Sequence, residues 1–261
     1  MIRQPQIVEI KEIITQTPTI KTFKFDWDYK VNPGEFVMVW NYKNEKPMSV
    51  SHISDGEIGI TVKNIGEFTS QLHSLEVGDT IGIRGSYGRG FTTDMEGEKI
   101  IAIGGGVGMA PINAVASTLA QNNDVSVISA AQNKDELLFC DSLEKSGVDV
   151  YPCTDDGSFG FEGFATDCLS DLVEKTTYNF AFVCGPEIMM KGIFDILEAL
   201  NIKGEYSLER YMKCALGLCG QCCVDNTGWR ICVEGPVFKN TDMKEIKEFA
   251  KYRRNASGQK I

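Results

Sequence analysis

The 261-residue sequence lacks several features that define common classes of protein. No apolar run approaches the roughly 20 residues of a membrane-spanning helix, and the first residues lack the apolar stretch of a secretory signal peptide. Basic residues are in the minority, with 26 Lys and Arg against 36 Asp and Glu, which argues against a general nucleic-acid-binding surface. The sequence therefore predicts a cytoplasmic protein that binds neither membrane nor nucleic acid.

Cysteine is absent before Cys140, yet the chain has nine cysteines and five of them lie within residues 214–232. In a chain without a secretion signal, such crowding favours metal or redox chemistry over a disulfide framework. The tail from Lys239 onward carries seven basic and three acidic residues. It reads as a charged helix from about Asp242, either docked on an acidic surface or simply solvated.

Residues 1–97 contain short runs rich in Ile, Val, Phe and Thr, separated by turn residues. The expected strands are 7–14, 19–25, 35–40, 47–53, 58–64 and 80–85. Because no long helical pattern interrupts them, they predict a small antiparallel β-barrel.

From residue 98 to 203, apolar strands alternate with helical patterns, which predicts an α/β domain with a parallel sheet wrapped by helices. The expected strands are 99–103, 125–130, 148–153 and 179–184, with helices beginning near Pro111, Lys134, Thr166 and Pro186. Residues 204–261 form a third segment that fits neither pattern and has two short strand candidates, around Val224 and Ile231.

The strongest chemical signal is the spacing of Cys214, Cys219 and Cys222, followed by Cys232 after nine residues. A C-x4-C-x2-C run with a later fourth cysteine is the plant-type spacing for a [2Fe-2S] cluster, although the last gap is short. A structural zinc site usually pairs two C-x2-C knuckles and fits less well. Cys223 falls outside this spacing and is therefore not expected to be a ligand.

A glycine-rich loop follows the strand at 99–103, with Gly104, Gly105, Gly106 and Gly108 ahead of Pro111. Glycines here allow the phosphates of a dinucleotide to approach the backbone at a helix N-terminus. The loop departs from the G-x-G-x-x-G fingerprint, so a merely tight strand-to-helix turn is the alternative. Two further stretches follow parallel strands, where nucleotide sites occur. These are Asp155 and Asp156 after the third strand, and Cys184, Gly185 and Pro186 after the fourth.

Together these motifs resemble the ferredoxin reductase-like flavoproteins, and within them the electron-transfer subunits of NAD-dependent dihydroorotate dehydrogenases. The resemblance covers nearly the whole chain, in the order flavin barrel, nicotinamide-binding domain and [2Fe-2S] segment. It implies FAD contacts at three stretches, where Lys46 replaces the family's Arg and Phe68 replaces a glycine. These stretches are Lys46, Pro47, Met48 and Ser49; Thr61, Val62 and Lys63; and Phe68 and Thr69.

The resemblance also implies that the glycine loop, Asp155 and Asp156, and Cys184 to Pro186 bind NAD(H), with Cys184 near the nicotinamide, and that all four cysteines are cluster ligands. The implied function is electron transfer between a dihydroorotate dehydrogenase catalytic subunit and NAD, with two copies of each subunit, in pyrimidine biosynthesis. The alternatives are a reductase subunit of a hydrogenase or of a ferredoxin-NAD(P) reductase, and a zinc-stabilised interaction protein. A single cation after the second strand of the α/β domain favours NAD over NADP.

Overall fold

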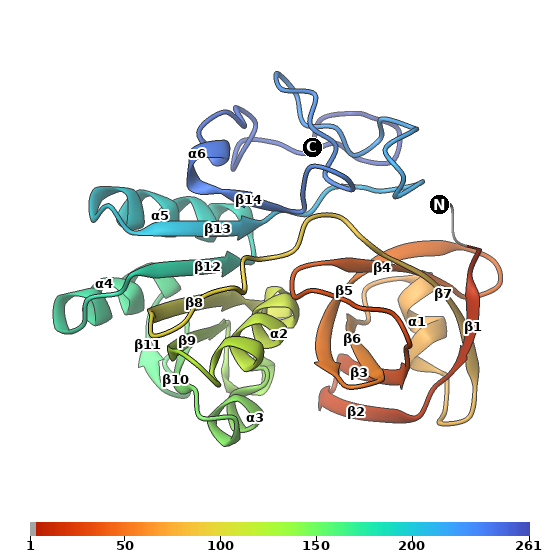
Figure 1. The fold of residues 1–261 in the computed structure, drawn as a ribbon, viewed down its shortest axis with the longest axis horizontal. Helices are drawn as coiled ribbons and strands as arrows, with labels where there is room; N and C mark the ends of the chain where they lie inside the picture. Colours follow the sequence, from red (N-terminus) through yellow and green to blue (C-terminus); the bar gives the residue numbers. More distant parts are fainter. Residues whose placement is uncertain (1–3) are drawn as a thin grey trace.

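The computed structural model describes residues 4–261, which form two seven-stranded sheets (Figure 1). The first sheet has the strand order β1-β7-β4-β5-β6-β3-β2 and is antiparallel throughout. Its strands are β1 (Gln6–Glu9), β2 (Glu12–Thr17), β3 (Ile20–Asp26), β4 (Phe36–Trp40), β5 (Glu45–Ser54), β6 (Glu57–Lys63) and β7 (Thr80–Tyr87).

The predicted strand at 7–14 is divided into two, and the division curls the sheet. The Ile10 N–H donates to the carbonyl of Asp79, the residue before β7, whereas the Lys11 N–H donates to the Lys24 carbonyl of β3. One stretch of chain therefore joins both edges of the sheet around a shared core, in which Phe23, Phe25 and Ile60 are almost fully buried. Burial of this apolar surface stabilises the barrel.

A short helix, α1 (Glu67–His73), follows β6 in a stretch for which the sequence predicted neither a helix nor a strand. The Thr69 hydroxyl accepts hydrogen bonds from the Ile65 and Gly66 N–H groups and so caps the start of the helix. Phe68 and Leu72 on its inner face pack into the barrel core. Seven residues are too few to show a helical period in the sequence.

The second sheet has the order β11-β10-β9-β8-β12-β13-β14 and is parallel except for the last pair. Its strands are β8 (Lys99–Gly105), β9 (Asp124–Ala131), β10 (Asp149–Thr154), β11 (Phe161–Glu162), β12 (Phe180–Cys184), β13 (Lys203–Ser207) and β14 (Val237–Lys239). This arrangement confirms the predicted fold class.

Four helices cover the two faces of this sheet (Figure 1). On the side toward the barrel, α2 (Met109–Leu119) and α3 (Cys140–Lys145) pack on Ile100 and Val127. On the other side, α4 (Ala165–Lys175) and α5 (Glu187–Ala199) pack on Ile101 and Ile103. The helix predicted from about Lys134 begins later, because residues 134–136 form only a 3-10 turn and Phe139 takes a left-handed conformation.

The C-terminal segment differs most from its prediction. The strand candidates around Val224 and Ile231 form no strand, and only an isolated bridge joins Cys223 to Arg230. The predicted tail helix is wrong as well, since α6 (Asn240–Met243) is short and turns follow it. Distant contacts hold these residues in place of helical hydrogen bonds, and Glu248 is 1% exposed.

Buried polar contacts fix the barrel, and the segment that follows it, against the α/β domain. The Asn113 amide of α2 donates to the Ser51 carbonyl of β5 at 2.8 Å. The Glu205 carboxylate of β13 is fully buried and accepts from the N–H and hydroxyl of Thr92, in the segment between the sheets, at 2.7 Å each. None of the helices between residues 4 and 261 has the length and apolar character needed to cross a membrane.

Candidate functional site: a cleft beside a cysteine loop

A cleft of about 910 Å³ lies between the barrel and the carboxyl ends of the parallel strands. This volume is within the range of cofactor and ligand sites. Twelve of the residues predicted to bind a cofactor line it: Pro47, Met48, Ser49, Thr61, Lys63, Gly105, Gly106, Gly108, Asp155, Cys184, Gly185 and Pro186. Stretches more than 130 residues apart in the sequence, from Pro47 to Pro186, therefore meet at one site.

The barrel wall of the cleft consists of neighbouring strands β5 and β6. β5 supplies Pro47, Met48 and Ser49, and β6 supplies Thr61 and Lys63. Alternation along a strand explains why Val62 is absent from this wall, since its side chain points into the barrel core and is 1% exposed.

The opposite wall is made by the glycine loop and the loop after β12, which pack tightly on each other. A Cβ at Gly108 would lie 2.5 Å from the Cys184 carbonyl oxygen, so no larger residue fits there. Gly106 has φ +53° and would carry its Cβ into open space. The loop thus presents bare backbone immediately before α2, an arrangement suited to the phosphates of a dinucleotide.

Cys184 ends β12 at this wall, and burial raises the pKa of its thiol to about 12. The thiol is therefore neutral at physiological pH, which suits packing against a flat ring better than nucleophilic attack. Its predicted place near the nicotinamide stays a prediction.

The remaining predicted FAD and NAD residues lie outside the lining of the cleft. The Lys46 ammonium stands 5.0 Å from the ring centroid of Tyr211, in the segment that leads to the cysteines. Phe68 is in the barrel core, and Thr69 caps α1 with its hydroxyl. Gly104 begins the glycine loop and is packed against Met109, which an added Cβ would contact. Asp156 is exposed and follows the end of β10. Their cofactor contacts stay predictions.

The four predicted cluster ligands lie near one another as two pairs. The Cys214 thiol interacts with Cys219, and the Cys222 thiol interacts with Cys232. Between residues 4 and 261, no three or more Cys, His, Asp or Glu side chains are grouped for a single metal ion. Two pairs of thiols match a two-iron cluster, which takes two protein ligands on each iron.

The cysteine loop also directs backbone N–H groups at sulfur. Partial burial opposes ionisation of Cys214, but the N–H groups of Leu216, Leu218 and Cys219 lower its pKa to about 7. The hydrogen bond from Cys232 lowers the pKa of Cys222 to about 6 and raises that of Cys232 itself. Amides around sulfur stabilise the negative charge of a thiolate-bound cluster, so this loop fits a [2Fe-2S] centre.

Two buried arginines tie the cysteine loop to the rest of the molecule. From the barrel, Arg84 forms two 2.6 Å hydrogen bonds with the Glu45 carboxylate and a 3.1 Å bond with the Cys214 carbonyl. From the segment before the loop, Arg210 donates through Nε to Glu248 at 2.8 Å and through Nη1 to Glu187.

The Arg210 contacts are extended by two backbone hydrogen bonds. Glu248 accepts the N–H of Asp225, which lies between Cys222 and Cys232. Glu187, the first residue of α5, accepts the N–H of Ala250 in the tail. We call Glu187, Arg210 and Glu248 the arginine hub. It joins the cleft wall, the cysteine loop and the tail.

Several residues that line the cleft escaped the sequence analysis. Phe36, Gln132, Glu136, Phe164, Met189, Ser207, Met212 and Arg253 are among them. Most come from elements whose spatial neighbours cannot be read from local patterns. Met212 is informative, because it lines the cleft only two residues before Cys214. The cleft and the cysteine loop therefore adjoin.

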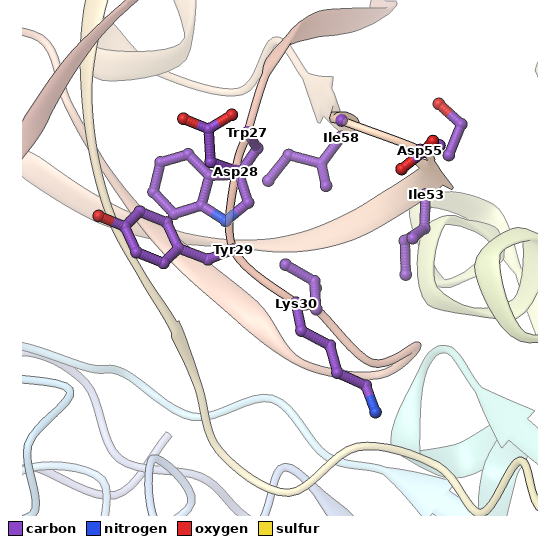
Figure 2. A pocket seen from close by; sticks show the side chains of 10 residues that line it. Trp27, Asp28, Tyr29, Lys30, Ile53, Asp55 and Ile58 are labelled. Atoms are coloured by element: carbon purple, nitrogen blue, oxygen red, sulfur yellow. The ribbon is translucent and has the colours of Figure 1, made fainter.

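A second, smaller cavity of about 390 Å³ lies at the end of the barrel (Figure 2). Residues 27–31 form one side and the turn between β5 and β6 forms the other, with Ile53, Asp55 and Ile58. Trp27 and Tyr29 meet edge to face at 5.4 Å between their ring centroids. None of the predicted site residues lines this cavity.

Known structures show the same fold. The chain superposes on the NADH-dependent reduced ferredoxin-NADP oxidoreductase with a TM-score of 0.80, at 24% identity and over 96% of both chains. It superposes on the cytochrome b5 reductase domain of Ulva prolifera nitrate reductase with a TM-score of 0.62, at 21% identity, over 76% of this chain and 94% of the other. The fold is that of the ferredoxin reductase-like oxidoreductases.

Family models match two parts of the chain. Residues 102–195 match an oxidoreductase NAD-binding domain, and residues 209–244 match the iron-sulfur cluster binding domain of dihydroorotate dehydrogenase B. Both ranges fall inside the segments 98–203 and 204–261, whose boundaries stay predictions.

Curated relatives align along the full length. A protein of Methanothermobacter thermautotrophicus named "Probable dihydroorotate dehydrogenase B (NAD(+)), electron transfer subunit" is 49% identical, over 98% of this chain and 97% of its own. A protein of the same name from Methanocaldococcus jannaschii is 45% identical, over 99% and 98%. The chain belongs to the family of dihydroorotate dehydrogenase B electron transfer subunits, which confirms the resemblance seen in the sequence.

Proposed function

We propose that this chain carries electrons between NAD and a dihydroorotate-oxidising catalytic subunit, through FAD in the cleft and a [2Fe-2S] cluster in the cysteine loop. The observation that carries the proposal is the single cleft whose walls come from β5 and β6, from the glycine loop and from Met212 beside Cys214. The family membership of the chain and the two pairs of thiols support the same reading.

The residues of this chain would bind and orient the redox groups. The strands at Pro47 to Ser49 and at Thr61 would hold the flavin, and the glycine loop and Cys184 would place the nicotinamide against it. FAD, when bound, accepts electrons in pairs and passes them on singly, which a nicotinamide cannot do. The apolar lining from Phe36, Met48 and Met212 would exclude water from the reacting rings.

The partner and the compartment belong to the same proposal. We expect a complex with two copies of each subunit, with NAD as the dinucleotide, because the relatives carry NAD(+) in their names. A cytoplasmic location is supported by the nine cysteines, none of which forms a disulfide between residues 4 and 261. The relatives are named as electron transfer subunits, so the oxidation of dihydroorotate is expected in the catalytic subunit alone.

The experiment uses protein purified without oxygen, alone and with its co-expressed catalytic subunit. We expect FAD and two irons per chain, NADH-driven reduction of an artificial acceptor by the chain alone, and NAD reduction by dihydroorotate only in the complex. Cys222→Ser should abolish the dihydroorotate reaction, while Cys223→Ser, one residue away, should leave it intact. Turnover of dihydroorotate by the isolated chain, or a colourless preparation without iron and flavin, would contradict the proposal.

A further inference from the structure

The charges that line the cleft leave one cation available. Four acidic residues line it, Glu136, Asp155, Glu187 and Glu209, with three basic ones, Lys63, Arg210 and Arg253. The Lys63 ammonium lies 3.8 Å from the Glu136 carboxylate, and Arg210 is held by Glu187 and Glu248. Arg253 is exposed and forms no side-chain hydrogen bond or ion pair with any residue from 4 to 261.

The backbone around Arg253 is fixed, although its side chain is free. Its N–H donates to the Ile261 carbonyl at 2.9 Å, and the Ile261 N–H donates back at 2.8 Å. The next residue, Arg254, pairs with Asp225 at 2.8 Å, and Ala250 is bonded to Glu187 at 2.8 Å. The tail is therefore anchored on both sides of Arg253, so binding a ligand through this guanidinium would require ordering of the side chain but not of the backbone.

A dinucleotide is an anion that must enter a cleft with more acidic than basic lining residues, in a chain of net charge −10. The glycine loop supplies N–H groups but no full positive charge. A guanidinium matches phosphate oxygens with two parallel hydrogen bonds. The tail residue Ala250 is bonded to Glu187, directly after Pro186, so the tail meets the cleft at the wall made by the glycine loop and the loop after β12, and Arg253 follows three residues later.

We propose that Arg253, presented by the C-terminal tail, binds a phosphate of the nicotinamide dinucleotide. The proposal rests on the proposed function, since it deepens the account of the same cleft. It gives the basic tail a role at the site: the tail contributes a substrate contact from beyond the cysteine loop.

The test measures binding of ADP-ribose, which has both phosphates of NAD but no nicotinamide, to flavin-loaded protein by titration calorimetry. Arg253→Gln should raise the Kd about tenfold, the effect of one charge-assisted hydrogen bond worth about 1.4 kcal/mol. Arg253→Lys retains the positive charge but cannot form two parallel hydrogen bonds, so its Kd should lie between those of the wild type and Arg253→Gln. Lys251→Gln is the matched control, because Lys251 is an exposed cation of the same tail that does not line the cleft.

A kinetic readout accompanies the binding measurement. Arg253→Gln should raise the KM for NADH with little change in kcat, and should weaken the dependence of KM on salt. Equal ADP-ribose affinities for Arg253→Gln and Lys251→Gln would overturn the inference while leaving NADH oxidation, and so the proposed function, intact. Loss of FAD from Arg253→Gln would also overturn it, by assigning the contact to the flavin phosphates, and so would a wild-type protein that oxidises NADH but does not bind ADP-ribose.

Discussion

Replacing Arg210 by Met should destabilise the protein far more than replacing a surface cation. The Arg210 side chain is 3% exposed and meets Glu248, whose side chain is 2% exposed, and Glu187 at 20%. Arg210→Met would leave two carboxylates in the protein interior without their cation. Removing one partner of a buried ion pair typically costs about 3–5 kcal/mol.

The surface comparison is Lys175→Met. Lys175 pairs with Asp171 along α4, but these side chains are 65% and 42% exposed, so water and salt screen the attraction. Such pairs contribute about 0.5 kcal/mol or less. Both variants exchange a cation for the same neutral side chain, so the contrast isolates burial.

Scanning calorimetry of the protein with its cofactors is the assay. At roughly 2–4 °C per kcal/mol for a chain of this size, Arg210→Met should lower the Tm by about 6–20 °C, and Lys175→Met by about 2 °C or less. Glu248→Gln keeps the shape of the side chain, so its Tm should lie between those of Arg210→Met and Lys175→Met. If Arg210→Met melted within about 2 °C of the wild type, the hub would contribute no net stability, and its attractions would merely offset the cost of desolvation.

Three further substitutions or treatments test the walls of the cleft and the cysteine loop. Gly108→Ala would press a methyl group against the Cys184 carbonyl, so NADH oxidation should fall more than tenfold in steady-state assays while FAD stays bound; normal activity would show that the loop can shift. Arg84→Met removes the hydrogen bond to the Cys214 carbonyl, so a chelator should extract iron several times faster than from wild type, as absorbance would report; an unchanged rate would assign Arg84 to the barrel alone. The Cys184 thiol, with a pKa near 12, should react with iodoacetamide at pH 8 far more slowly than glutathione, because the thiolate is the reactive form. Because the folded pKa of Cys184 lies above the ordinary 9.0, the stability that the neutral thiol contributes is complete below pH 9 and is lost as the pH rises toward 12. Rapid labelling of Cys184 at pH 8, detected by mass spectrometry, would refute the raised pKa.

The sequence predicted the strands and the cofactor motifs because both are local patterns. Alternation of apolar residues identified the strands that became β3 to β7, and the turn chemistry separated them. The rule that ligands bind beyond the carboxyl ends of parallel strands brought Gly106, Asp155 and Cys184 to one site, and all three line the cleft. The cysteine spacing similarly predicted four cluster ligands, and their binding of iron stays a prediction.

What the sequence could not predict depends on contacts between distant residues. The charged pattern after Asp242 suggests an exposed helix, yet Glu248 is buried because Arg210 lies beside it. β13 also escaped notice, since the buried Glu205 in its centre looks like a surface residue until Thr92 is placed next to it. The basic tail was evident in the sequence, but the place of Arg253 at the cleft was not, because it follows from a tail folded back on the cleft.

The buried bonds from Asn113 to Ser51 and from Glu205 to Thr92 have a consequence for turnover. The first bond joins the barrel directly to α2, and the second fixes the segment between the two sheets to β13, so a swing of the barrel away from the sheet would have to break at least the buried Asn113–Ser51 bond. Domain swings on the microsecond-to-millisecond scale gate many enzymes. A junction held in this way would keep the barrel wall and the glycine-loop wall of the cleft at a constant separation, so we expect electron flow through the cleft to proceed without a closing step.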